Sequence, residues 1–372
     1  MAMANDSSPE VLIVGGGVIG LMLGRALLPS GRSVCLLESG QPGQQASWAS
    51  AGLVADLAPR DTDPVALLRH PCVEDYELLS RELVDETGVD IEYVRHGWII
   101  VALDDEQADL LAQETARQRA LGVETELVQG PALREAEPGL GPRILAARLT
   151  PGGQLEPRRL VRALAISFVR RGGQLLTGRP ALAVLRAGER VTGVRTETGD
   201  VLAEAVVIAA GSWSGLLAGC DPPIKVGPQR GQILALRPRV SPIRRVVMRV
   251  DDPYLASRAS GRFIVGATRE FAGYDRSLTA GGVGWLLSEA ISMVPDLADA
   301  SIDEMWTGFR PLSADGLPII GPASPDGLFY ATGHGPSGIM LAPGTVRGMT
   351  ALLGGNESPI PLGAFAPQRF SA

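Results

Sequence analysis

Lysine, histidine and cysteine are all scarce in this chain of 372 residues. Lys225 is the single lysine, and only three histidines and three cysteines occur. Cys35, Cys72 and Cys220 are widely spaced and form no CxxC pair, which argues against a disulfide framework or a zinc site and fits a reducing compartment. The histidines show no HExxH or HxH spacing, so we expect no metal centre.

Positive charge is also in deficit. Lysine and arginine number 34 against 41 aspartates and glutamates, which gives a formal net charge of −7. An acidic chain without a basic block is a poor candidate for a nucleic-acid partner. The hydrophobic fraction of 45% excludes a disordered chain, and the length is enough for two to three domains with sizeable cores.

An uninterrupted hydrophobic run of about 18 residues is missing as well. The most hydrophobic stretch, 11–28, contains Arg25 and five glycines, and its leader is acidic where a secretory signal would be basic. We therefore expect a soluble, cytoplasmic protein without an integral membrane segment.

That stretch instead predicts a dinucleotide-binding unit. Its parts follow in order as a buried strand, a GxGxxG loop, a helix, a second strand and an acid, at 11–14, 15–20, 21–30, 33–37 and Glu38. Gly15 allows the tight turn, Gly17 lets the backbone approach a pyrophosphate, and Gly20 lets helix and strand pack closely. The helix N-terminus offers N–H groups to phosphates, and Glu38 offers acceptors to ribose hydroxyls. The alternative is a tight turn that binds no ligand.

Two further segments favour FAD over NAD. The stretch 44–53 is rich in small and hydroxyl residues, which suits a loop beside a flavin and its pyrophosphate. A buried strand over 205–208 follows a β-meander over 190–199 and ends in small residues. Trp213 occupies the central place of Gly211–Gly215, so this segment is not the GxSxG elbow of a hydrolase.

Three C-terminal segments, 261–268, 306–321 and 331–343, are the most distinctive. With them, and from Val11 to about Leu353, the chain resembles the FAD-dependent oxidases of the D-amino-acid oxidase superfamily, most closely the glycine oxidases of thiazole biosynthesis. The resemblance implies an α/β fold (α+β overall), with a Rossmann-like FAD-binding domain of glutathione-reductase type and a substrate domain with an antiparallel sheet. We predict the FAD-binding domain in 1–85, 151–224 and 304–372, and the substrate-binding domain in 86–150 and 225–303.

The resemblance also assigns the FAD-binding residues. They are Gly15, Gly17, Val18, Ile19, Gly20, Glu38, Ser39, Ala46, Ser47, Ser50, Ala51, Gly52, Leu53, Val184, Ala210, Gly211, Trp213, Gly308, Arg310, Gly333, His334, Gly335, Ser337, Gly338, Ile339 and Met340. A helix predicted to begin at Gly338 would direct its N–H groups at the flavin pyrimidine edge. For Ser337 a helix N-cap, and for His334 a structural loop role, stay open as alternatives. No cysteine lies beyond Cys220, which favours noncovalent FAD.

The implied reaction is the oxidative deamination of glycine or another small amino acid. Hydride passes from Cα to flavin N5, the imine hydrolyses to a 2-oxo acid and ammonia, and O2 is reduced to H2O2. Arg310 would hold the substrate carboxylate through two parallel bonds, with Tyr254 closing the other side. The alternatives are a structural salt bridge for Arg310 and a half-buried strand aromatic for Tyr254.

Three candidate substrate-pocket residues depart from the glycine-oxidase pattern. Pro336 stands where an arginine is usual, Arg269 where a medium apolar residue is usual, and Asp252 where a histidine is found. These differences point away from strict glycine specificity. Our hypothesis is that Arg269 faces the substrate pocket and favours a second carboxylate or another polar group, the alternative being a surface ion pair with Glu270 or Asp275.

Rival functions stay open from the sequence. One is an FAD-dependent dehydrogenase that oxidises sarcosine, a proline-like imino acid or a D-amino acid and passes electrons to a quinone or protein acceptor. Another is a flavin subunit that needs a partner for turnover. The resemblance also implies a possible homo-oligomer.

Overall fold

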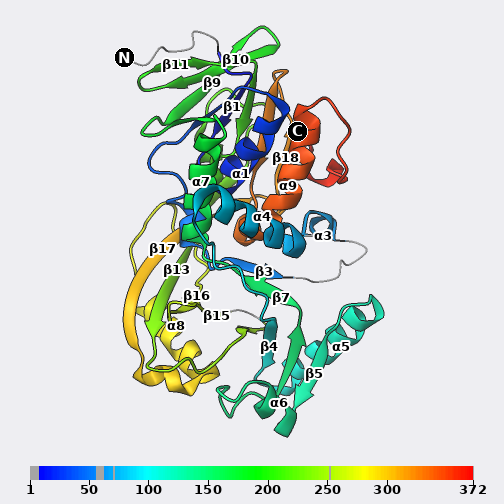
Figure 1. Ribbon diagram of the computed structural model, residues 1–372, viewed down its shortest axis with the longest axis vertical. Coiled ribbons are helices and arrows are strands. Elements are labelled where there is room, and N and C mark those ends of the chain that lie inside the picture. Colours follow the sequence, from blue (N-terminus) through cyan, green and yellow to red (C-terminus); the bar gives the residue numbers. More distant parts are fainter. Residues whose placement is uncertain (1–7, 56–62, 70–71, 251–252, 372) are drawn as a thin grey trace.

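The computed structural model describes residues 8–55, 63–69, 72–250 and 253–371. Two sheets organise them, one in the upper and one in the lower half of Figure 1, and the C-terminus lies in the upper half. The short pair β3 (Leu53–Ala55) and β7 (Gly152–Gln154) lies between these halves.

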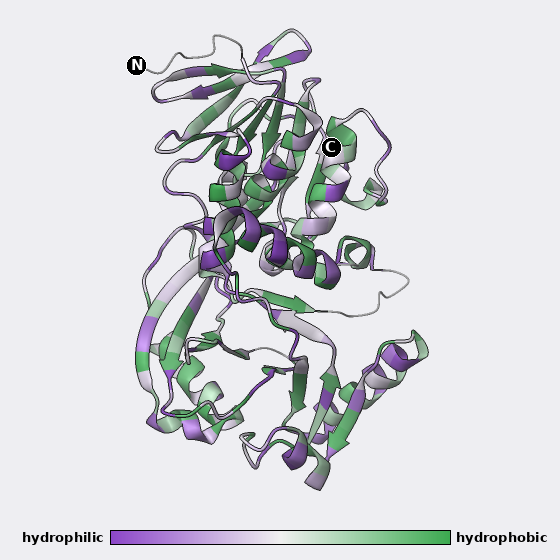
Figure 2. Ribbon diagram, viewed as in Figure 1, coloured by the Kyte–Doolittle hydropathy of each residue, from purple (hydrophilic) through white to green (hydrophobic). Residues whose placement is uncertain are grey.

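The upper sheet has six strands and carries the predicted dinucleotide-binding unit. In spatial order they are β18 (Ile319–Pro322), β19 (Leu328–Thr332), β12 (Ala205–Ile208), β1 (Val11–Val14), β2 (Val34–Leu37) and β8 (Gln174–Leu176). Only the β18–β19 pair among them is antiparallel. β1 and β2 are continuous apolar runs, as strands covered on both faces require, and hydrophobic colour fills the strands of the upper half in Figure 2.

Helices supply the apolar cover for this sheet. α1 (Val18–Leu27) packs against α7 (Pro157–Arg170) and α9 (Gly338–Leu353), and α4 (Cys72–Thr87) packs against the last two. A separate antiparallel sheet of β9 (Ala181–Ala187), β10 (Arg190–Thr196) and β11 (Gly199–Leu202) lies above, as the predicted meander. α3 (Pro64–Arg69) also packs on this half, against α9.

The lower sheet has eight strands. In order they are β17 (Ser301–Ser313), β13 (Val226–Arg237), β16 (Phe263–Gly266), β15 (Tyr254–Ser257), β14 (Val246–Arg249), β4 (Trp98–Ala102), β6 (Ala146–Thr150) and β5 (Glu126–Gln129). α8 (Ala280–Met293) covers one part, and α5 (Asp105–Ala120) and α6 (Gly130–Ala136) lie beside β4, β5 and β6. The predicted combination of a Rossmann-like unit and a second sheet domain is therefore what the chain adopts.

Three details differ from the expectations. The first helix begins at Val18 and not at residue 21, because Gly17 is its N-cap. The lower sheet is not wholly antiparallel: β4 and β14 run parallel, since they come from distant pieces of the chain and no hairpin joins them. The boundary predicted between 303 and 304 falls inside β17, which pairs with β13 up to Ser313.

No described helix combines the length and the apolar character needed to cross a bilayer. In the same part of the chain, no three His, Cys, Asp or Glu side chains gather as metal ligands would.

Candidate active site

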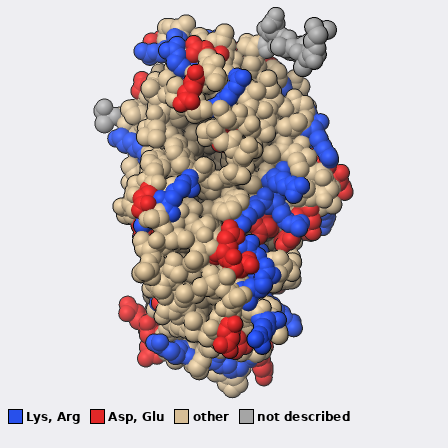
Figure 3. Space-filling model, turned by 90° about the vertical axis from the view of Figure 1, so that its left-hand side faces the viewer, with Lys and Arg blue, Asp and Glu red and all other residues tan. Residues whose placement is uncertain are grey.

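A cavity of about 640 Å³ connects the two halves of the molecule. Its wall runs from the loop between β1 and α1, past β17 and the start of α9, to β13, β14 and β15. The face of the molecule on which β17 lies in Figure 1 is hollowed in its upper half (Figure 3). Ligand sites commonly form at such junctions of two sheets.

The glycine loop is built for close approach. Gly15 has φ +113°, and a Cβ there would lie 2.4 Å from the carbonyl oxygen of Ala209 at the end of β12. A Cβ on Gly20 would lie 2.0 Å from the carbonyl oxygen of Gly15, so this position must be glycine for the helix to pack. A Cβ on Gly17 would meet only Ser47 Oγ, at 3.4 Å, and so would point into the cavity.

Glu38 is buried and held in place beside this loop. Its carboxylate accepts hydrogen bonds from Gly16 N (2.8 Å), Gly40 N (2.8 Å) and Ser39 Oγ (3.0 Å). An ionised carboxylate has about four acceptor positions, so capacity remains for a ribose hydroxyl at the cavity wall. The glycine cradle, the start of α1 and this acid together fit the adenosine and pyrophosphate of a dinucleotide.

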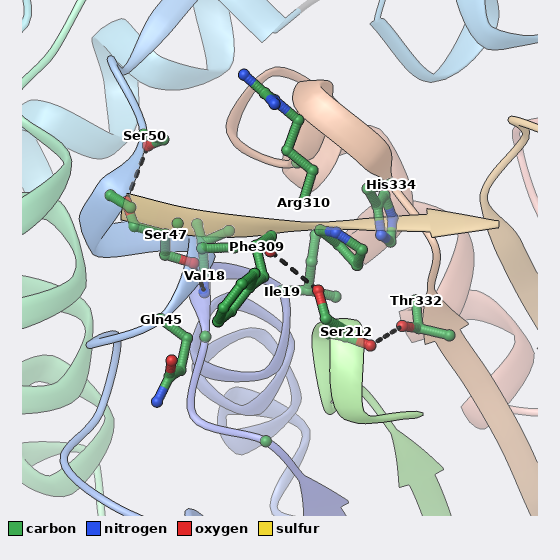
Figure 4. Close-up of a pocket in the computed structure, with 18 of the residues that line it drawn as sticks. Val18, Ile19, Gln45, Ser47, Ser50, Ser212, Phe309, Arg310, Thr332 and His334 are labelled. Carbon is green, nitrogen blue, oxygen red and sulfur yellow. Dashed lines mark hydrogen bonds between the residues drawn. The ribbon is translucent and has the colours of Figure 1, made fainter. Parts of the chain in front are cut away.

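The short helix α2 (Ala46–Ala49) forms one side of the cavity. Ser47 Oγ accepts a hydrogen bond from Val18 N (3.0 Å), which places this hydroxyl at the start of α1, as Figure 4 shows. Trp306 Nε1 donates to Ala49 O (3.1 Å), and a Cβ on Gly308 would lie 2.5 Å from Ala49 Cβ. Gly308 therefore lets β17 pass close to α2.

Arg310 lies at the end of the cavity formed by the lower sheet. It projects from β17 on the side opposite Phe309, as alternation along a strand requires (Figure 4). Its Nη1 donates to Thr268 O at 2.9 Å, and a Cβ on Gly231 would lie 2.8 Å from Nη1. The guanidinium is thus held against two backbone segments of the cavity wall.

Tyr254 and Arg269 line the same end of the cavity. Tyr254 opens β15 directly opposite Gly266 of β16, and a Cβ on Gly266 would lie 2.2 Å from the Tyr254 hydroxyl oxygen. The phenol therefore lies flat on the Gly266 backbone, with its position set by this close approach. Arg269 follows β16 and its side chain is exposed.

His334 is a buried residue of the cavity wall next to the start of α9. Its Nε2 lies 3.0 Å from Thr345 Oγ1. Burial lowers the pKa of its imidazole to about 4, so the ring is neutral near pH 7. Ser337 is the N-cap of α9 by position, but its side chain makes no capping hydrogen bond, so the predicted hydroxyl cap is not formed.

Most of the predicted site residues line this one cavity. They are Gly15, Gly17, Val18, Ile19, Glu38, Ser39, Ala46, Ser47, Ser50, Ala51, Gly52, Leu53, Ala210, Gly211, Trp213, Gly308, Arg310, His334, Gly335, Ser337, Gly338, Ile339 and Met340, together with Tyr254, Arg269 and Pro336. Gly20, Val184 and Gly333 do not line it: Gly20 packs beneath the loop, Val184 lies in a hydrophobic core, and Gly333 (φ +76°) turns the chain after β19. Asp252 lies outside the described residues.

The sequence did not indicate several other wall residues. Gly231 and Ile233 are two residues apart on β13 and lie on the same side of that strand. They face the cavity together with Gly308 and Arg310 of β17. Their register pairs Gly231 directly with Gly308. The two-residue alternation of side chains along 229–233 and 306–310 can be read from the sequence. Only the pairing of the two strands, which lie about 75 residues apart in the chain, shows that these residues share a wall.

The comparisons with known proteins agree with this geometry. Residues 10–352 match the model of a family described as FAD dependent oxidoreductase. The chain is 35% identical over 365 residues to a glycine oxidase of Pseudomonas aeruginosa (97% of this chain, 99% of the relative). It is 34% identical to a glycine oxidase of Geobacillus kaustophilus (97% of each chain). The crystal structure of glycine oxidase from Geobacillus kaustophilus superposes with a TM-score of 0.92 at 31% identity, covering 97% of this chain and 98% of that one. The predicted fold class and cofactor are thereby confirmed, and the chain belongs to the FAD dependent oxidoreductase family.

Proposed function

We propose that this protein catalyses the FAD-dependent oxidative deamination of glycine or another small amino acid. The substrate loses two electrons and two protons to become an imine, and water converts the imine to a 2-oxo acid and ammonia. O2 takes up the two electrons and two protons and leaves as H2O2. The glycine oxidases to which the chain is similar over nearly its whole length support this reaction class.

The observation that carries the proposal is the position of Arg310. Its guanidinium is fixed by Thr268 O at the lower-sheet end of a cavity whose other end is the glycine cradle. A planar guanidinium grips a carboxylate through two parallel bonds, which sets the orientation of the substrate as well as its affinity. An amino acid bound there would present its Cα toward the middle of the cavity.

The other wall residues would orient the substrate and exclude water. When bound, FAD supplies the hydride acceptor, and the protein supplies position and electrostatics. Tyr254 closes the pocket beside Arg310, while Trp98, Ile233 and Met248 present apolar surface at the same end. A dry, pre-shaped wall keeps the reacting Cα–H bond in one orientation.

We further propose that the FAD is bound noncovalently and that the protein is cytoplasmic. Cys35, Cys72 and Cys220 are all described, none of them forms a disulfide, and none lines the cavity. A homo-oligomer stays an expectation that only the family resemblance implies.

Oxygen uptake by the FAD-reconstituted protein tests the reaction class. With glycine, sarcosine and small D- and L-amino acids supplied singly, we expect at least one to give O2 consumption, H2O2 and ammonia in equal amounts, with methylamine in place of ammonia for sarcosine. Turnover only with an added quinone or dye, and no peroxide, would favour the dehydrogenase. Turnover only after addition of a partner subunit would favour the flavin subunit that needs a partner.

A further inference from the structure

A buried arginine lies behind the middle of the cavity wall. Arg258 follows β15 directly, and its side chain is 4% exposed. Its Nη2 donates a hydrogen bond to the carbonyl oxygen of Ala51. Ala51 lines the cavity, whereas Arg258 does not. The guanidinium therefore contacts this part of the wall from the side that faces away from the cavity.

Two further groups hold this guanidinium in one orientation. Arg258 Nη1 donates to Gln154 Oε1 at 2.8 Å, and Arg258 Nε lies 3.2 Å from Glu156 Oε2. Gln154 in turn donates from Nε2 to the carbonyl oxygen of Ser257 at 2.6 Å. Moving the guanidinium out of this arrangement would leave a buried charge uncompensated, which is costly. Nη2 is therefore fixed against Ala51.

The segment 49–53 forms one side of the cavity between its two ends. A Cβ on Gly308 would lie 2.5 Å from Ala49 Cβ, so the segment begins beside β17, two residues from Arg310. It ends at the start of β3, which lies between the two halves of the molecule (Figure 1). The glycine cradle fits the pyrophosphate and Arg310 fits the substrate carboxylate. The space between them, beside 49–53, is the part of the cavity left for the flavin ring.

Donors behind the wall bind two successive carbonyl oxygens of this segment. Arg258 binds that of Ala51. Leu155 N donates to that of Gly52 at 2.9 Å, and neither Leu155 nor Arg258 lines the cavity. The two peptide bonds are trans, and in a planar trans peptide the N–H group points opposite to the C=O group. The N–H groups of Gly52 and Leu53 therefore point toward the cavity, which both residues line.

We propose that Arg258 is a positioning residue for the cofactor: it holds the Ala51 carbonyl oxygen so that Gly52 N–H donates a hydrogen bond to the flavin ring. FAD gains negative charge on reduction, so a fixed N–H donor stabilises its reduced form more than its oxidised form and raises its midpoint potential. The inference rests on the proposed oxidation, in which FAD in this cavity accepts the electrons. An arginine with a structural role only would leave the midpoint potential unchanged.

The midpoint potential of the bound FAD tests this role without any substrate. Arg258→Met alone would leave the largely buried Glu156 carboxylate uncompensated, so it is combined with Glu156→Gln. The two positions then carry no net charge, as in the wild type, and glutamine keeps an oxygen that can accept the α7 N-cap bond from Arg158 N. We expect a fall of about 30 mV or more in midpoint potential. This is a tenfold change in the two-electron equilibrium constant, as loss of one charge-assisted hydrogen bond would cause.

Two more variants complete the test. Arg258→Lys keeps the positive charge beside Glu156 and covers the case in which the double variant does not fold. An ammonium group lacks the fixed fork that reaches Ala51 and Gln154 together, so the midpoint potential should fall in the same direction by a smaller amount. Arg148→Met is the matched control, because Arg148 is equally buried, lies 3.6 Å from a glutamate and does not line the cavity. It should lower the urea midpoint but leave the potential of FAD unchanged.

The outcomes separate this inference from the proposed function. If every folded Arg258 variant keeps the wild-type midpoint potential, or Arg148→Met lowers it equally, the role given to Arg258 is overturned and the proposed function stands. If the potential falls only in the Arg258 variants but no amino acid reduces the wild-type flavin, the role of Arg258 toward FAD is supported and the proposed function fails.

Discussion

At the scale of single residues, Arg310 bears most of the proposed substrate binding. Arg310→Met keeps the length of the side chain but removes both donors that a carboxylate would use. We expect kcat/KM for the best amino acid to fall by about 100-fold, with the loss mainly in KM, because hydrogen bonds to charged groups contribute about 1.5–3 kcal/mol. Flavin content, measured by absorption after gel filtration, should stay unchanged. An unaltered KM would place the carboxylate elsewhere.

The buried position of His334 predicts how the stability of the protein changes in acid. The pKa of its buried imidazole lies near 4, below its unfolded value of 6.5, so the unfolded state binds the proton more readily. The contribution of the neutral imidazole to the free energy of unfolding is about 3 kcal/mol in total. It is fully present above pH 6.5 and is lost as the pH falls toward 4. In urea unfolding between pH 7 and 4, His334→Gln should show a flatter pH dependence than the wild type. The matched variant His96→Gln, at an exposed loop position, should leave the slope as it is.

At the scale of secondary-structure elements, the register of β13 and β17 positions the substrate anchor. A Cβ on Gly231 would lie 2.8 Å from Arg310 Nη1, so Gly231→Ala should displace the guanidinium. Because the displaced group is the flexible end of a side chain, the fold should tolerate the change while kcat/KM drops about tenfold or more. Gly227→Ala on the same strand adds a methyl to open space and is the control. Equal kinetics for both variants would contradict the role given to this register.

The turn between β1 and α1 leads to a similar prediction about FAD affinity. A Cβ on Gly17 meets only Ser47 Oγ, at 3.4 Å, so Gly17→Ala should cost about 1 kcal/mol or less in unfolding free energy. The same methyl points into the cavity and blocks close approach of a pyrophosphate, so the Kd for FAD should rise about tenfold or more. Fluorescence titration of the FAD-free protein measures this Kd. Gly284→Ala in α8, again with open space around it, should leave it unchanged.

At the scale of the whole molecule, Arg158 joins the two halves. It lies 3.6 Å from the ring centroid of Trp48 and 4.8 Å from that of Trp306, and it donates twice to Glu304, both at 2.9 Å. Burial acts to raise the pKa of Glu304, but hydrogen bonds from Arg158 and Arg262 lower it below its usual value. These contacts tie α7 and α2 to β17.

Loss of this junction should destabilise the protein measurably. We expect Arg158→Met to lower the unfolding free energy by about 2 kcal/mol, since it removes a partly buried ion pair and two cation–π contacts. Arg195→Met removes an exposed pair with Asp200 on the β10–β11 hairpin and should change stability much less, because solvent screens such a pair. Urea midpoints compare the two variants. Similar small losses would mean that the junction contributes no more than a surface pair.

How far the sequence predicts this molecule depends on the range of the contacts involved. The strand–loop–helix–strand unit over 11–38 follows from local patterns, because its glycines, apolar runs and acid all act within one supersecondary unit. The role of Gly231, the parallel β4–β14 pair and the position of β17 depend on pairing between distant segments, which no local pattern specifies. Arg310 was found through the resemblance alone. Local periodicity gives no reason to single out that arginine.

The anaerobic spectrum of the FAD-bound protein during addition of single amino acids tests the proposed reaction most directly. We expect glycine or another small amino acid to bleach the flavin band at about 450 nm, the ordinary region of an oxidised flavin, and air to restore it. A yellow protein whose band no mono- or dicarboxylic amino acid bleaches would contradict the proposed substrate class. A protein that binds no FAD would contradict the assignment of the cavity itself.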